Sequence, residues 1–490
     1  MERMSTLDAG FFFVEDENTP MHVGSVAVFD GPPPSYGDLV RLLLAKLGDV
    51  PRYRQRVQTV PLHLGRPLWA DDPHFEILYH VRHSAVPAPG GPEQLRNLAG
   101  RVFAQRLDLS KPLWEMYLVE GVADNRWAII SKVHHCMIDG VAGWDLMALL
   151  LDADPDAALP RPKTWTPEAA PSSVALLAGG LRDVVGAPLE QASRIPALAG
   201  SLLGRQDLVA FSRGLVAAAR RLGDRTARSL NGACGPHRRW EWTQASLSEV
   251  KVIRTALGGT VNDVVLAAVT RGFRDLLAGR GELTPGQVVR SLVPVSVRTE
   301  TERGSLTNKV SALLVNLPVG EPDPLRRLSR LREQMDNLKQ TRQAVGAQTL
   351  TELAGFAAPT LLALGSRLSF RIPQPVMQTV TTNVPGPRVP LYLLGRQMVE
   401  VHPYVPIASN ILTSIGILSY LDLLNFGINA DFDRVADIST LTNGIRTGVD
   451  ELLELAHDSA AAGSGRGGRG GRGGRGRANP DRQRQRRGAQ

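Results

Sequence analysis

Apolar residues recur in short runs and at helical spacing along most of the chain, and they predict alternating strands and helices. Residues 113–119 and 127–133 are apolar runs of strand length, and the polar residues 123–126 between them are typical of a hairpin turn. Residues 141–151 are apolar at helical spacing. This part of the chain therefore predicts two paired strands and a helix, with a strand-to-helix junction near residues 134–140.

The same mixed pattern returns in the second half of the chain. A stretch rich in Pro and Ala, residues 155–171, interrupts the pattern and predicts a boundary, and the pattern resumes near residues 235–240. Further strands are predicted at residues 288–297, 310–317 and 410–418. The sequence therefore predicts an α/β fold of the mixed α+β type in both halves.

Chain length and these boundaries predict two domains. The 490 residues exceed what one compact core usually holds. We place the first domain at residues 1–165, a helical connector at 166–235, the second domain at 236–460 and a tail at 461–490.

The tail differs from the rest of the chain in composition. From Gly463 to Gln490 it contains nine arginines and one acid, Asp481, with almost no apolar residue, so it cannot form a core. Its net charge of +8 equals that of the whole chain and leaves 47 basic and 47 acidic residues elsewhere. We expect a disordered basic tail, which could contact anionic lipid headgroups or nucleic acid through its Arg-Gly-Gly repeats. No aromatic residue lies between the arginines, so a solvated tail without a partner is the simpler interpretation.

The cysteines and the start of the chain bear on the compartment. The only two cysteines, Cys136 and Cys234, are far apart in sequence, which gives no disulfide framework and fits a reducing compartment. The apolar run at residues 10–14 is too short for the core of a secretory signal. We therefore expect a cytoplasmic protein.

Membrane contact is a separate question. No uninterrupted run reaches the ~18 to 20 apolar residues that a transmembrane helix needs, and the best candidate, residues 353–364, contains Pro359. This segment and residues 175–203 combine apolar residues with scattered arginines, which is typical either of interfacial docking or of core-facing helices. We expect no membrane crossing, while peripheral contact with the inner membrane or a lipid droplet stays open.

The strand-to-helix junction carries the heptapeptide His134-His-Cys-Met-Ile-Asp-Gly140. A histidine at a strand end can project into a cleft, and its ordinary pKa near ~6.5 suits a general base at neutral pH. Asp139 can cap the following helix, and Gly140 lets the backbone turn or approach another group closely. We assign His135 as the candidate base.

Other interpretations of the heptapeptide are weaker. Paired histidines with an Asp four residues on could bind a metal, but no other His, Cys or Asp cluster has the spacing of the remaining ligands. A buried structural histidine is the second alternative. Cys136 next to His135 suggests a thiol nucleophile, yet adjacent residues of an extended strand point to opposite faces, so we interpret Cys136 as packing.

The motif His134-His-x-x-x-Asp-Gly140 resembles the signature of the coenzyme A-dependent acyltransferase superfamily. Further segments resemble the bacterial wax ester synthase/diacylglycerol acyltransferase family specifically, and they occur in the family's order over roughly residues 1–460. They are Leu7-Asp8, Pro20-Met-His-Val-Gly24, Pro112-Leu-Trp-Glu115, Asn262-Asp263, Pro294-Val-Ser-Val-Arg298 and Asn383-Val-Pro-Gly-Pro387.

Several of these segments also have structural explanations. Trp114 is expected in the core, and Gly386 in a turn, where a glycine permits a positive φ. A polar side chain of Asn262 or Asp263 could cap the helix that begins there, or Asn262 could face the cleft.

The resemblance implies a fold and a site. It implies two chloramphenicol acetyltransferase-like domains joined by the connector, with the active-site channel between them. In this interpretation His135 is the general base, His134 supports it, and Asp139 organises the site by pairing with Arg298. Asn262 or backbone N–H groups near Gly140 would stabilise the oxyanion.

The resemblance also implies an activity. The protein would transfer a long-chain acyl group from acyl-coenzyme A to diacylglycerol or to a long-chain alcohol, without an acyl-enzyme. No cofactor or metal is implied, since acyl-coenzyme A is a co-substrate, and poorly soluble substrates imply a membrane or lipid-droplet surface. The alternatives are an acyltransferase for another hydroxyl or an amine, and a non-catalytic lipid- or nucleic-acid-associated protein that acts through its tail.

Overall fold

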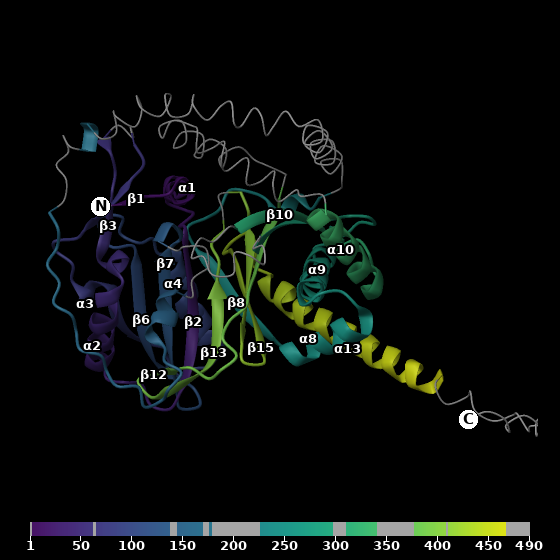
Figure 1. Cartoon of the computed structure of the whole chain (residues 1–490). Coiled ribbons are helices and arrows are strands. Elements are labelled where there is room, and N and C mark those ends of the chain that lie inside the picture. Colours follow the sequence, from purple (N-terminus) through teal and green to yellow (C-terminus); the bar gives the residue numbers. More distant parts are fainter. Residues whose placement is uncertain are drawn as a thin grey trace, which may run out of the picture.

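The computed structural model describes residues 2–61, 65–137, 145–169, 176–178, 226–296, 310–340, 377–407 and 410–466. These residues form a mixed α/β structure with two six-stranded sheets and one small three-stranded sheet (Figure 1). The predicted fold class is therefore confirmed.

The first large sheet has the strand order β12-β13-β2-β7-β6-β5. Its strands are antiparallel, apart from the parallel pair β5 and β6. They are β2 (His22–Asp30), β5 (Val81–Ala85), β6 (Trp114–Val122), β7 (Arg126–His134), β12 (Tyr392–Leu393) and β13 (Arg396–Tyr404). The second half of the chain therefore supplies two strands, β12 and β13, to the sheet of the first half. This sheet combines residues from both sides of the boundary predicted at residue 236.

The second large sheet has the order β10-β9-β11-β14-β15-β8. Only β11 pairs in parallel, with β9 on one side and β14 on the other. The strands are β8 (Arg238–Ser246), β9 (Val289–Ser296), β10 (Val310–Leu317), β11 (Thr379–Val384), β14 (Thr413–Tyr420) and β15 (Leu423–Asp431). The strand predicted at residues 310–317 is β10 without any shift, whereas the one predicted at 410–418 begins at Thr413.

The small sheet lies beside the N-terminus and has the order β1-β4-β3. Its strands are β1 (Glu2–Arg3), β3 (Gln55–Gln58) and β4 (Leu68–Asp71). Trp69 of β4 lies in a core cluster with Met4, Phe13 and Cys136. The small sheet thus packs against the region that holds the predicted catalytic motif.

The helices of each half cover the sheets (Figure 1). Helix α2 packs on the first sheet, and α8, α9, α10 and α13 pack with the second. The α-helices are α1 (Thr6–Val14), α2 (Tyr36–Lys46), α3 (Ile77–His80), α4 (Pro92–Ala104), α5 (Asp145–Leu150), α8 (Leu247–Leu257), α9 (Val261–Gly279), α10 (Pro324–Gln340) and α13 (Ile438–Arg466). The 3-10 turns are η1 (Leu47–Asp49), η2 (Pro51–Arg54), η4 (His135–Met137) and η5 (Arg228–Leu230).

The two large sheets meet where β13 ends. Gly416 of β14 and Gly427 of β15 are paired across their strands, and Pro403 of β13 lies against both. A Cβ at position 427 would stand 1.7 Å from the Pro403 carbonyl oxygen, so only glycine fits there. This close approach fixes the strand that the second half inserts into the first sheet.

The hairpin predicted at residues 123–126 is present between β6 and β7. Asp124 and Asn125 have φ values of 62° and 54°, the left-handed conformation at both central positions of a type I′ turn. The hairpin brings the end of β7, with His134, back to the beginning of β6.

Two structural interpretations of the family-like segments, for Trp114 and for Gly386, have different outcomes. Trp114 is fully buried, and its indole N–H donates to the Tyr53 carbonyl at 2.8 Å, as expected for a core residue. Gly386 does not use the positive φ that a glycine permits. Glycine is needed there because a Cβ would lie 2.0 Å from the Ser419 carbonyl oxygen.

Several predicted segments lie outside the described residues. They are most of the connector at 166–235, the apolar segment 353–364 and the tail beyond Arg466. Helix α13 continues to Arg466, so it includes the first residues of the predicted tail.

Among the described helices, no single one has the length and apolar composition for crossing a membrane. Helices α8 and α9 meet these criteria only as a pair, and they are bent by 102° relative to each other. Most of the apolar residues of α9 are buried in the core of the second half, which explains its composition.

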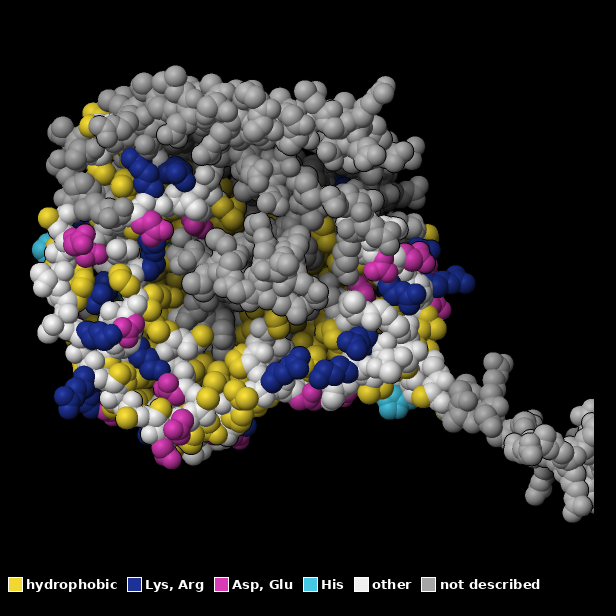
Figure 2. All heavy atoms as spheres, in the orientation of Figure 1, with side chains coloured by type: hydrophobic (Ala, Val, Ile, Leu, Met, Phe, Trp, Pro, Cys, Tyr) yellow, Lys and Arg dark blue, Asp and Glu magenta, His cyan; other side chains and the backbone are white. Residues whose placement is uncertain are grey.

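Charged side chains of both signs are interspersed over the described surface on the face shown in Figure 2. This distribution agrees with the balance of 47 basic and 47 acidic residues before the tail.

Candidate active site

The two motif histidines lie where β7 ends and the 3-10 turn η4 begins. The backbone N–H of His134 donates to the Leu113 carbonyl at 2.9 Å, and that of His135 donates to the Met21 carbonyl at 2.8 Å. The turn is therefore held between the beginning of β6 and the segment that enters β2. The predicted strand-end position of the histidines is correct.

His134 is fully buried, and its hydrogen bonds determine which ring nitrogen carries the proton. Its Nδ1 accepts a hydrogen bond from the Cys136 backbone N–H at 3.1 Å. A nitrogen that accepts cannot carry a proton, so the proton is on Nε2. Nε2 lies 3.2 Å from Oε2 of Glu15. The Nε2 side of the fully buried His134 ring therefore lies against the Glu15 carboxylate.

Glu15 connects this histidine to Met21, just before β2, and to Arg106, just after α4. Its side chain is 1% exposed and accepts hydrogen bonds from the Met21 backbone N–H at 2.9 Å and from Arg106 at 2.8 and 3.1 Å. Burial raises the pKa of Glu15, but the bonds from His134, Met21 and Arg106 outweigh it and lower the pKa to about 2. Glu15 is therefore a carboxylate at neutral pH.

Sequence analysis missed Glu15 as a site residue. It directly follows the apolar run of helix α1, and in the sequence it looks like the charged end of that run. The signal that could have identified it is its place as the first acid of the run Glu15-Asp-Glu17, directly after the apolar residues 11–14 and shortly before the segment Pro20-Met-His-Val-Gly24, which resembles the family.

His135 has surroundings that suit a neutral base. Its ring stacks on Phe11 of α1, with centroids 3.8 Å apart and an angle of 23° between the ring planes. Burial lowers the pKa of His135 to about 4. Nδ1 is buried without a hydrogen bond to another described residue. At pH 7 the imidazole is neutral, so one of its ring nitrogens can accept a proton.

Cys136 is a packing residue, as predicted, but for a different reason. It belongs to the 3-10 turn and not to an extended strand, so the argument from opposite faces does not apply. The thiol lies in a core cluster with Met4, Ala9 and Phe13, and burial raises its pKa well above the ordinary value. A thiol that stays protonated is a poor nucleophile.

A second buried charge network lies two residues before the histidines. Nζ of Lys132 is 3.1 Å from Oε2 of Glu115 and donates to the carbonyls of Val102 and Gln105. Tyr117 donates to the same carboxylate at 2.9 Å. This network ties β6, β7 and the end of α4 together, which explains Glu115 in the family-like segment without a catalytic role.

His22 is another buried residue of a family-like segment. Its Nε2 is 2.9 Å from the Phe103 carbonyl, and its ring stacks on Tyr404 of β13 with centroids 5.6 Å apart. Burial lowers its pKa well below the ordinary value. His22 therefore joins α4 and the inserted strand β13 to β2.

Asn262 lies in the first turn of α9, and its neighbour provides the cap. Asp263 and Thr260 form a capping box, in which Thr260 Oγ1 accepts from the Asp263 backbone N–H and Oδ2 of Asp263 accepts from the Thr260 backbone N–H. The Asn262 side chain instead accepts from Nδ2 of Asn383 at 3.4 Å. Two family-like segments far apart in sequence are thus in contact.

The remaining predicted site residues lie outside the described residues: Asp139, Gly140 and Arg298. The described structure brings together His134, His135, Glu15 and Phe11. It places Asn262 with Asn383 in the second half.

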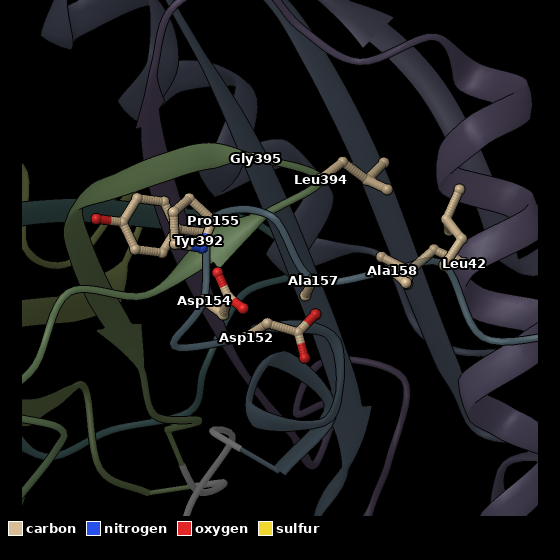
Figure 3. Close-up of a pocket in the computed structure, with 10 residues that line it drawn as sticks. Leu42, Asp152, Asp154, Pro155, Ala157, Ala158, Tyr392, Leu394 and Gly395 are labelled. Carbon is tan, nitrogen blue, oxygen red and sulfur yellow. The ribbon is translucent and has the colours of Figure 1, made fainter.

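A shallow pocket near α2 is not this site. Its lining includes Leu42, Asp152, Asp154 and Tyr392 (Figure 3). Asp152 is paired with Lys46 at 2.8 Å, and neither motif histidine lines the pocket.

Comparison with known families agrees with the motifs. The chain matches the wax ester synthase/diacylglycerol acyltransferase catalytic domain over residues 4–265 and the C-terminal domain of the same family over residues 306–453. The chain belongs to this family. It is therefore an acyltransferase, and the catalytic-domain match includes α1, Glu15, both histidines and Asn262.

One relative within the family is the probable diacylglycerol O-acyltransferase tgs1 of Mycobacterium tuberculosis. It is 36% identical over 458 residues, which cover 93% of this chain and 96% of the relative. The level of identity and the near-complete coverage extend the family likeness over both halves of the chain.

Solved structures of other proteins have the same fold as this chain. The wax ester synthase/diacylglycerol acyltransferase from Marinobacter aquaeolei VT8 has a TM-score of 0.64 and 24% identity, covering 93% of this chain and all of that one. The starter condensation domain of rhizomide synthetase has a TM-score of 0.56 and 15% identity, covering 94% of this chain and 95% of the other. At these identities the likeness concerns the fold.

Proposed function

We propose that the protein transfers a long-chain acyl group from acyl-coenzyme A to the free hydroxyl of diacylglycerol, and to long-chain alcohols. The observation that carries the proposal is the neutral, oriented His135 in a chain that is 36% identical to a probable diacylglycerol O-acyltransferase. A neutral imidazole, with Nε2 as the nitrogen that takes the proton, is what abstraction of a hydroxyl proton requires.

In the proposed reaction His135 takes part in two proton transfers. The acceptor oxygen attacks the thioester carbonyl carbon while Nε2 takes the hydroxyl proton. The tetrahedral intermediate then breaks its C–S bond, and the imidazolium returns the proton to the departing thiolate. The products are the ester and free coenzyme A, and no bond to the enzyme forms.

The other residues support the base and the intermediate. His134 and Glu15 hold the turn that carries His135. Asp139 and Arg298 pair to organise the segment after the turn, and Asn262 donates a hydrogen bond to the oxyanion. An Asn262→Ala enzyme should then turn over about 100-fold more slowly, the loss typical of one oxyanion donor. Unchanged turnover in this variant would exclude Asn262 from that role.

The proposed function is tested by thiol release from palmitoyl-coenzyme A. Purified protein is assayed with diacylglycerol in mixed micelles, with hexadecanol, and with no acceptor. Acceptor-dependent release, with triacylglycerol or wax ester recovered in equal amount, supports the proposal. If thiol is released only with another hydroxyl compound or with an amine, that compound is the acceptor, and diacylglycerol and long-chain alcohols are not.

The pH dependence of this reaction should show an unusually acidic base. Because the pKa of His135 is lowered to about 4, the base stays deprotonated down to about pH 5, and kcat/KM falls only below that. A base with the ordinary pKa would lose activity near pH 6.5. The measurement is kcat/KM for palmitoyl-coenzyme A from pH 4.5 to 8, with thermal unfolding followed at each pH to exclude acid denaturation. An acid limb near pH 6.5 would contradict the expected environment of His135.

A further inference from the structure

The single ring contact between α1 and His135 involves a side chain that the core does not require. Phe13, on the same helix, is 2% exposed and belongs to the core cluster around Cys136. Phe11 is only partly buried and is not a member of that cluster. Its ring instead faces the His135 ring, with centroids 3.8 Å apart. Stability alone therefore does not explain the placement of Phe11.

The geometry of the stack suits a base that must stay oriented and reactive. Aromatic pairs usually have centroids 4.5–7 Å apart, so this contact at 3.8 Å is close. The basic lone pair of an imidazole nitrogen lies in the ring plane, whereas Phe11 covers one face of the ring. The stack can therefore restrain rotation of the ring without blocking Nε2.

The hydrogen bonds of His135 to other described residues fix its backbone but not its ring, which interacts otherwise with its own backbone. Its N–H is bonded to the Met21 carbonyl at 2.8 Å, while Nδ1 makes no hydrogen bond to another described residue. A base usually has a hydrogen-bonded partner that orients the ring. Among the described side chains, the Phe11 ring is the contact available for that purpose, beside the residue's own backbone.

We propose that Phe11 is the positioning residue for His135: its ring fixes the plane of the imidazole and shields one face from water. This inference rests on the proposed role of His135 as general base. Helix α1 then contributes two contacts to the histidine turn. Phe11 stacks on His135, and Glu15, directly after the helix, contacts His134.

The first test measures the pKa of His135 directly and does not depend on activity. Full-length protein labelled at histidine Cε1 is titrated by NMR, and the His135 signal is assigned with a His135→Gln sample. Phe11→Ala should raise the pKa by one unit or more, because the ring face becomes exposed to water. Phe13→Leu is the matched control, with a lower melting temperature and an unchanged His135 pKa. An unchanged pKa in Phe11→Ala would overturn the proposal.

The second test measures turnover at pH 8, where His135 is neutral in every variant. Phe11→Ala should lower kcat about tenfold and leave the KM for palmitoyl-coenzyme A within twofold, because orientation and not binding is lost. Phe11→Tyr, which keeps the stack, should recover most of kcat. A KM effect alone, or a loss that Phe11→Tyr shares, would overturn the positioning role. If wild type lacks turnover while the NMR shift is present, the proposed function fails and the stack is still established.

Discussion

Replacing His135 by alanine is expected to lower kcat by about three orders of magnitude, with the fold retained. General base catalysis contributes typically ~10²–10⁴-fold, and the proposed mechanism contains no second base to replace His135. The side chain is only partly buried and its ring makes one aromatic contact, to Phe11, so its loss removes little core packing. The measurement is acceptor-dependent thiol release by the variant beside wild type.

A matched variant separates this effect from a general disturbance of the turn. Cys136→Ser changes the next residue, which packs in the core and has no proposed chemical role. It should keep most of kcat while lowering the melting temperature. The assignment of His135 would be refuted by an alanine variant that retains more than a tenth of wild-type kcat, with unchanged acyl-coenzyme A binding.

Glu15→Gln is the second change with a large expected effect, because it acts on both stability and turnover. The side chain keeps its size, but its amide presents donors to His134 and Arg106, which are themselves donors. Displacement of the histidine turn by even about 1 Å is expected to cost roughly 100-fold in kcat. Glu17→Gln is the control, since Glu17 is exposed and lies two residues further along.

The stability effect of Glu15→Gln should depend on pH in a defined direction. The pKa of Glu15 is lowered to about 2 in the folded protein, below its ordinary value of 4.5. Its carboxylate therefore stabilises the fold above pH 4.5, by on the order of 3 kcal/mol, and this contribution is lost as the pH falls toward 2. Urea unfolding of both proteins between pH 3 and 7 should show a difference in free energy that shrinks at acidic pH. A constant difference would mean that the carboxylate charge does not contribute.

The sequence was sufficient to predict those features that are determined within one contiguous segment of the chain. The hairpin at residues 123–126, strands β6 and β7 and the histidine turn follow from local patterns, because turn residues and apolar runs act over a few positions. Cys136 was also interpreted correctly as packing. The core position of Trp114 follows in the same way from its place at the start of an apolar strand.

The sequence was less informative where a residue is defined by a distant partner. Glu15 acquires its role only from His134 and Arg106, and Phe11 only from His135, so neither pattern is visible locally. Gly386 was interpreted as a turn glycine that permits a positive φ, but the close Ser419 carbonyl is the reason for glycine there. The insertion of β12 and β13 into the first sheet depends on pairing between segments at opposite ends of the chain, which apolar periodicity does not encode.

The pairing of β13 with β2 has a consequence for synthesis on the ribosome. β2 ends at Asp30, but its partner ends at Tyr404, so one edge of β2 stays open while most of the chain is being made. An open strand edge can pair with other chains. The edge of β2 stays exposed to such pairing until the ribosome has synthesised β13. The N-terminal half therefore has to leave the ribosome as an incomplete domain, and a chaperone that covers this edge should raise the yield of soluble enzyme.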